Sequence, residues 1–168
     1  MTTPYQRVQI SNETPINRRR RIALAVLYLC VMGMCSITLC ALGATLPQLA
    51  SRASNGKEDA LDVASIYIVR GIGAVLGAAC SSSIFKACHG NHALSLSLTT
   101  LAMVLLLLPA CRDMAAFHSL FILMGFATAT LDTGVQIMTR KAHEGTTETG
   151  VWLGANTVSF GVSGAIVP

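Results

Sequence analysis

Five long apolar segments, separated by short polar connections, constrain this 168-residue chain more than any other feature. A bilayer core about 30 Å thick is crossed by about 20 helical residues, and a helix satisfies its backbone hydrogen bonds within one segment. The sequence therefore predicts an all-α polytopic membrane bundle that follows a disordered cytoplasmic tail at residues 1–21. Pro47 is expected to close the first span. The expected spans are residues 22–46, 63–85, 93–110, 115–138 and 151–167.

Composition supports a membrane protein over a soluble domain. The chain is 52% hydrophobic and only 12% charged, whereas soluble domains carry about 25% charged residues. Aromatic residues make up only 5% of the chain, and no sustained period-two alternation occurs, which disfavours a porin-like barrel. No nucleophile–base set lies at a shared depth, and the cluster of Cys88, His89 and His92 lacks a second half for a metal site. We therefore expect neither an enzyme nor a metal centre.

The distribution of the twelve cations predicts the orientation of the chain. With the N-terminus inside, the inner side holds more cations than the outer side, as cytoplasmic sides do. The inner cations would be Arg7, Arg18, Arg19, Arg20, Arg21, Lys86, Arg140 and Lys141, and the outer ones Arg52, Lys57 and Arg112. No DNA- or RNA-binding motif accompanies the basic run, so nucleic acid is not an expected partner. We expect a multi-pass protein of the plasma membrane with a cytoplasmic N-terminus.

Two charges interrupt the apolar spans. Asp132 lies eight residues before Arg140, roughly 12 Å from the inner boundary and close to the midplane, and Arg70 lies at a similar depth from the outer one. A charge in lipid costs about 2.5–3.5 kcal/mol on insertion scales, so both groups should face the bundle interior or water. Asp132 is either a buried structural partner of Arg70 or of polar groups nearby, or it lines an aqueous cavity and binds substrate, a coupling cation such as Na⁺ or H⁺, or both. The second reading is favoured. For Arg70 we expect a role as a structural charge partner, with a role as a ligand as the alternative.

Other polar side chains follow helical spacing near this acid. Gln136 is four residues after Asp132 and shares its helical face. In the fifth span, Trp152, Asn156 and Ser159 follow the spacing i, i+4, i+7. Such groups can meet sugar hydroxyls, and an indole can stack on a sugar ring, so we predict Asp132, Gln136, Asn156 and Trp152 as substrate-binding residues. The alternatives are hydrogen bonds between helices and, for Trp152, a place in the interfacial aromatic belt.

Small residues indicate close helix packing. The pair Gly73-xxx-Gly77 predicts a face against which another helix packs. We expect the same of Gly150-xxx-Gly154 and of Gly161-xx-Gly164 in the fifth span. His118, near the start of the fourth span, is expected to face the membrane interface.

Two stretches carry a family resemblance. "GFATATLDTGVQIM" (125–138), followed by "GVWLGANTVSFGVSGAIVP" (150–168), resembles spans 4 and 5 of major facilitator superfamily sugar transporters, in particular the fucose–proton symporter branch with its sodium-dependent glucose transporter-like relatives. That branch carries [DE]-T-[AG]-x-[NQ] in span 4, which Asp132, Thr133, Gly134 and Gln136 fill here. "LGATLPQLA" (42–50) is similar to its L-P-Q stretch, so the resemblance covers roughly residues 42–168.

The resemblance implies a transporter of a hexose or related sugar that works by alternating access. Its complete fold would have about 12 spans in two halves, so we expect this chain to be a truncated first half that lacks its C-terminal half or partner helices. In that family the span 4 acid, here Asp132, takes part in sugar binding and cation coupling, and Asn156 would contact sugar. The chain lacks the acid that proton-coupled members carry near Gly43 and the usual Asp beside Lys86, so sodium coupling and facilitated diffusion stay open. The alternative is a non-transporting membrane protein, such as an assembly subunit or a transporter remnant.

Overall fold

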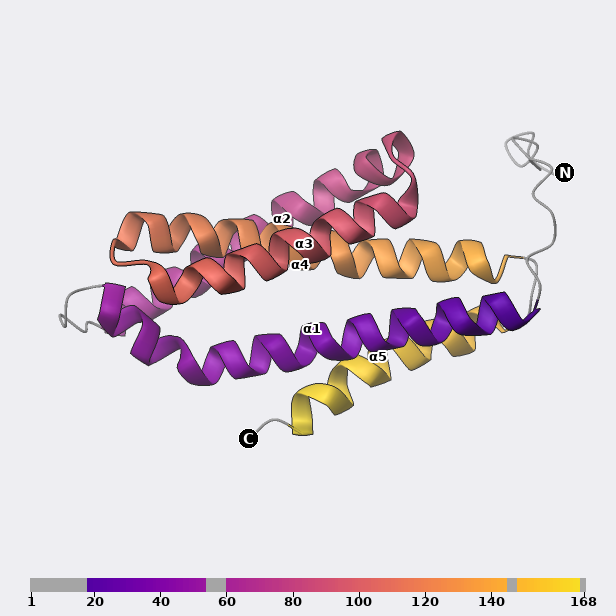
Figure 1. Cartoon of the computed structure of the whole chain (residues 1–168), viewed down its shortest axis with the longest axis horizontal. Helices are drawn as coiled ribbons and strands as arrows, with labels where there is room; N and C mark the ends of the chain where they lie inside the picture. Colours follow the sequence, from indigo (N-terminus) through magenta and orange to yellow (C-terminus); the bar gives the residue numbers. More distant parts are fainter. Residues whose placement is uncertain (1–17, 54–59, 145–147, 167–168) are drawn as a thin grey trace, which may run out of the picture.

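The computed structural model describes residues 18–53, 60–144 and 148–166, and regular structure in these ranges is helical (Figure 1). The all-α prediction is therefore confirmed for the part of the chain that the structure describes. The elements are α1 (Arg18–Ala53), α2 (Ala60–Ala87), α3 (Gly90–Leu107), the 3₁₀ turn η2 (Leu108–Ala110), α4 (Met114–Ala142) and α5 (Thr149–Ile166).

Four helical stretches of the described residues are long and apolar enough to cross a membrane, where the sequence predicted five. They cover Arg19–Arg52, Ala64–Ala87, Gly90–Ala110 and Met114–Ala142. The fifth predicted span does form a helix, α5, but this helix has only 18 residues and contains Gly, Ser, Thr and Asn at many positions. Because of these polar and small residues, α5 is not apolar enough to count among the helices that could cross a membrane. The four apolar helices are compatible with a multi-pass membrane protein.

Helix α1 corrects two sequence predictions. It begins at Arg18, so the last four residues of the predicted tail are helical, while residues 1–17 lie outside the described residues. It also continues through Pro47 to Ala53 instead of ending there. Proline removes one backbone hydrogen bond and crowds the carbonyl four residues earlier, here that of Gly43, and Figure 1 shows α1 changing direction towards its C-terminal end. The prediction failed because a proline bends an apolar helix of this length without ending it.

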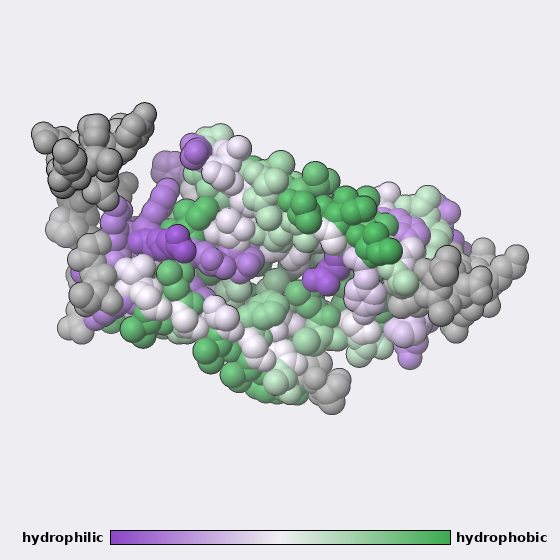
Figure 2. Space-filling view, turned by 180° about the vertical axis from the view of Figure 1, so that it is seen from behind, coloured by the Kyte–Doolittle hydropathy of each residue, from purple (hydrophilic) through white to green (hydrophobic). Residues whose placement is uncertain are grey.

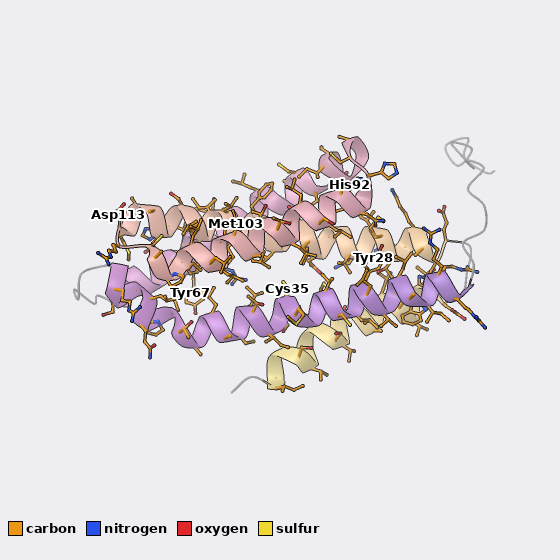
Figure 3. The ribbon with its side chains drawn as sticks, viewed as in Figure 1. Tyr28, Cys35, Tyr67, His92, Met103 and Asp113 are labelled. Atoms are coloured by element: carbon orange, nitrogen blue, oxygen red, sulfur yellow. The ribbon has the colours of Figure 1, made fainter. Side chains whose placement is uncertain are left out.

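The connection between α3 and α4 is short and locally encoded. Pro109 lies in the first turn of η2, after which the chain leaves the helical conformation at Cys111. Asp113 then caps α4, because its side chain accepts a hydrogen bond from the backbone N–H of Ala116 at 3.3 Å (Figure 3).

The helices form two groups: α2, α3 and α4 make up the first, and α1 and α5 make up the second, which lies against α4. Helices α2 and α3 pack on one side of α4, while α1 lies against another side of α4 and carries α5 (Figure 1). The side chains of α4 accordingly make up much of the buried core, and Phe117, Met124 and Leu131 are fully buried. Large apolar side chains such as Val75 and Leu106 lie exposed on the outside, which is compatible with a surface that faces lipid.

Glycines set the crossing of α2 and α4. A Cβ atom added to Gly73 would collide with the backbone of Ile122, and one added to Gly77 would collide with the backbone of Phe126. From the other side, Gly125 of α4 lies against the carbonyl group of Arg70. The predicted packing face at Gly73 and Gly77 is therefore confirmed, with α4 as its partner.

The glycines of α5 behave differently. A Cβ atom on Gly150, Gly154 or Gly161 would meet nothing within 4 Å in the described chain, so the prediction of a packing face at Gly150 and Gly154 is wrong. Only Gly164 lies close to another helix, because its Cβ would stand 2.7 Å from Oγ of Ser36 in α1. Spacing alone does not reveal which face of a helix meets a neighbour.

Candidate functional site

The contacts between α2 and α4 fix the relative depth of the two charges. The helices run parallel, since Ser65 lies against His118 near their start and Thr130 reaches the carbonyl of Gly77 further along. Arg70 is level with Gly125, because its carbonyl group contacts that glycine. Asp132 comes seven residues after Gly125, which corresponds to about two turns, or roughly 10 Å along the helix.

Arg70 has an unsatisfied donor. Its Nε atom is buried, and it finds no hydrogen-bond partner among the described residues. No salt bridge between Arg70 and Asp132 is present in the described part of the chain. The reading of Asp132 as a structural ion-pair partner of Arg70 therefore does not hold in this structure. Buried polar groups nearly always have a partner, and an orphan calls for an explanation.

Asp132 lies on an exposed part of α4 and bonds to one of its predicted neighbours. Its Oδ1 atom accepts a hydrogen bond of 3.3 Å from Nε2 of Gln136, one turn further along. Thr128, one turn before Asp132, is instead buried and donates to the carbonyl of Gly125 at 3.0 Å. The carboxylate and the amide thus form one polar pair that is open to a further partner.

Cys35 of α1 completes this region. Its side chain is 7% exposed, and it lies within electrostatic reach of both Asp132 and Arg70. Figure 3 places it on the edge of α1 that faces the group formed by α2, α3 and α4. Hydrophilic surface also appears in the hollow between the two helical groups, as well as towards the ends of this face (Figure 2). We call Cys35, Arg70, Asp132 and Gln136 the central polar cluster.

The sequence did not single out Cys35, because a cysteine in an apolar span is normally a small packing residue. Its position held a weak signal, since Cys35 lies about halfway along α1, between Arg19 and Arg52. Recognising that signal required the knowledge that α1, α2 and α4 meet at this level.

The predicted ligands of α5 lie elsewhere. Asn156 is only 3% exposed, and its Nδ2 atom donates to Oγ1 of Thr139 at 3.0 Å. Trp152 stacks on the ring of His143, with centroids 5.4 Å apart. Ser159 donates to the carbonyl of Leu29 in α1 at 3.0 Å.

The polar stripe of α5 therefore shares one face, as its spacing predicted, and this face packs on α4 and α1. Thr139 follows Asp132 by seven residues, so Asn156 is bonded roughly 10 Å along α4 from the acid. The structure brings Asp132 and Gln136 together, and it does not bring Asn156 or Trp152 to them.

His118 corrects another prediction. It was expected to face the interface, but it is half-buried between α2 and α4. The carbonyl of Met114 can only accept, so Nδ1 of His118 donates to it at 2.9 Å. In the neutral ring Nε2 is then an acceptor, and the hydroxyl of Ser65 donates to it at 2.8 Å. The histidine links the second turns of the two helices.

A cavity of about 920 Å³ lies between the C-terminal half of α1 and the end of α3. Its α1 lining runs from Ile37, two residues beyond Cys35, to Arg52 at the end of the helix, a length of roughly 22 Å. None of the four predicted substrate-binding residues lines it. The cavity is lined by α1, α3 and η2, and no residue of the central polar cluster lines it.

Among the residues that the structure describes, no three His, Cys, Asp or Glu side chains are grouped so that they could hold a metal ion. Comparison of the chain with protein-family models, with curated proteins and with solved structures found no match.

Proposed function

We propose that the chain is a membrane transporter subunit that binds a small polar solute, of the hexose class, at the central polar cluster and moves it by alternating access. One observation carries this proposal. Arg70 and Asp132 are opposite charges midway along apolar helices, and they are not paired with each other. Such groups within membrane helices mark substrate and ion pathways.

The energetics favour a site over a purely structural role. A buried donor without a partner costs about 1–3 kcal/mol, and more when the group is charged. In a purely structural bundle, a lower free energy would result if the two charges were paired or if apolar residues stood in their place. Their separation by two turns is consistent with a space that water and a solute share.

The chemistry of the cluster suits hydroxylated solutes. The carboxylate of Asp132 accepts hydrogen bonds from hydroxyl groups, and the amide of Gln136 both donates and accepts. In this proposal Asp132 also holds a coupling cation, Na⁺ or H⁺, whose charge it balances. The close, glycine-lined crossing of α2 and α4 makes them one rigid unit, against which α1 and α5 would move.

A second candidate is a non-transporting membrane protein, and one observation favours it. Two of the predicted ligands, Asn156 and Trp152, are engaged in packing α5 on α4. In such a protein the polar stripe of α5 would serve assembly, and the central polar cluster would bind nothing.

Uptake of radiolabelled hexose into vesicles that contain the full chain separates the two candidates. We expect uptake above that of empty vesicles, and an at least tenfold loss in Asp132→Asn, because a hydrogen bond to a charged group is worth about 1.5–3 kcal/mol. Glu144→Gln is the matched control, since this exposed carboxylate follows the end of α4. Uptake that Asp132→Asn leaves unchanged refutes the role of the acid, and the absence of uptake by the unaltered chain supports the second candidate.

A further inference from the structure

We propose that the solute carries a carboxylate, which Arg70 binds, together with hydroxyl groups that Asp132 binds: a hydroxylated organic acid of monosaccharide size, such as a hexuronate. This inference rests on the proposed transport function and specifies the substrate class of the same site. It assigns Arg70 as a ligand, where the sequence favoured a structural cation.

The unsatisfied Nε donor of Arg70 is the first argument. Nε of Arg70 is buried without a partner, and between residues 64 and 142 the chain has only two acids, Asp113 and Asp132. Asp113 caps the start of α4, and Asp132 forms no salt bridge with Arg70. The described helices around Arg70 therefore offer it no carboxylate. A guanidinium matches a carboxylate in shape and charge through two parallel hydrogen bonds.

The spacing is the second argument. Along the common direction of α2 and α4, the backbone of Asp132 lies about two turns, or roughly 10 Å of helix rise, beyond the level of Arg70. A solute that contacts both side chains therefore needs a carboxylate and hydroxyl groups at different ends of the molecule, as a hexuronate has.

The charge balance is the third argument. A neutral hexose would supply only hydroxyl oxygens to Arg70 and leave its positive charge uncompensated away from bulk water. A hexuronate compensates that charge while its hydroxyl groups still donate to Asp132. Cys35 is uncharged in its thiol form, so it leaves this charge balance unaltered.

Equilibrium binding to the purified full chain in lipid nanodiscs tests the inference with three sugars that differ mainly in charge. The probes are radiolabelled D-glucuronate, D-glucose and protonated D-glucosamine. We expect glucuronate to bind at least tenfold more tightly than glucose, and glucosamine to bind most weakly, because a charge-assisted pair is stronger than a neutral hydrogen bond.

Two substitutions assign the effect to Arg70. In Arg70→Gln the affinity for glucuronate should fall to within about threefold of that for glucose, whereas Arg70→Lys should keep part of the preference through its charge. Arg112→Gln is the matched control, because this arginine is exposed in the connection before α4. Circular dichroism and size-exclusion profiles identify variants that fail to fold.

The outcomes separate the inference from the function on which it rests. Equal binding of glucose and glucuronate, or an unchanged preference in a folded Arg70→Gln variant, overturns the inference and leaves the proposed transport site standing. Preference for glucosamine also overturns it, since Asp132 would then dominate recognition. Binding of none of the three sugars overturns both the inference and the hexose-class function.

Discussion

The crossing of α2 and α4 gives the sharpest stability prediction, for Gly73→Ala. The new Cβ atom would collide with the carbonyl group and Cα of Ile122. These are backbone atoms of a packed helix, so they cannot rotate away as the end of a side chain could. Overpacking of this kind costs about 1–3 kcal/mol. The higher helix propensity of alanine offsets about 0.5–1 kcal/mol of this cost.

Gly71→Ala is the matched control, because it lies on the same helix and its Cβ would meet nothing within 4 Å. This variant gains the helix preference without the collision, so we expect the free energy of unfolding of Gly73→Ala to lie about 1–3 kcal/mol below that of Gly71→Ala. Denaturant titration of both variants in mixed micelles, followed by circular dichroism, measures the difference. Equal stabilities within about 0.5 kcal/mol would show that α2 and α4 do not approach each other at this glycine.

Two further predictions concern hydrogen bonds between helices. A double-mutant cycle of Asn156→Ala and Thr139→Val should give a coupling energy of about 0.6–1.7 kcal/mol in the same unfolding assay; no measurable coupling would show that the amide does not join α5 to α4. Ser65→Ala and His118→Phe should likewise destabilise the chain non-additively, because each removes the same contact between α2 and α4, and additive losses would argue against that contact.

The existence and approximate limits of the helices could be predicted from the sequence, because long apolar runs leave the backbone few alternatives. The pair of Gly73 and Gly77 also gave a correct packing face. Pro47 misled, since proline normally ends helices of soluble proteins, whereas in α1 the flanking apolar turns continue the helix.

The partners of polar residues were harder to predict. The spacing of Trp152, Asn156 and Ser159 identified a common face correctly, but spacing does not say which neighbour that face meets. In the folded chain this face of α5 packs against α4 and α1. Cys35 was missed for the complementary reason, since its position halfway along α1 is only a weak signal and does not reveal that charges on α2 and α4 lie near it.

The central claim is that water and a solute reach the middle of α4, and cysteine accessibility tests it most directly. The variant Asp132→Cys, in a chain whose six native cysteines are replaced, is treated in sealed vesicles with a membrane-impermeant methanethiosulfonate applied from each side. Val75→Cys is the control, because Val75 is 70% exposed on the apolar outer surface of α2. We predict rapid labelling at position 132 from at least one side and none at position 75. A cysteine at position 132 that neither side labels would contradict the account.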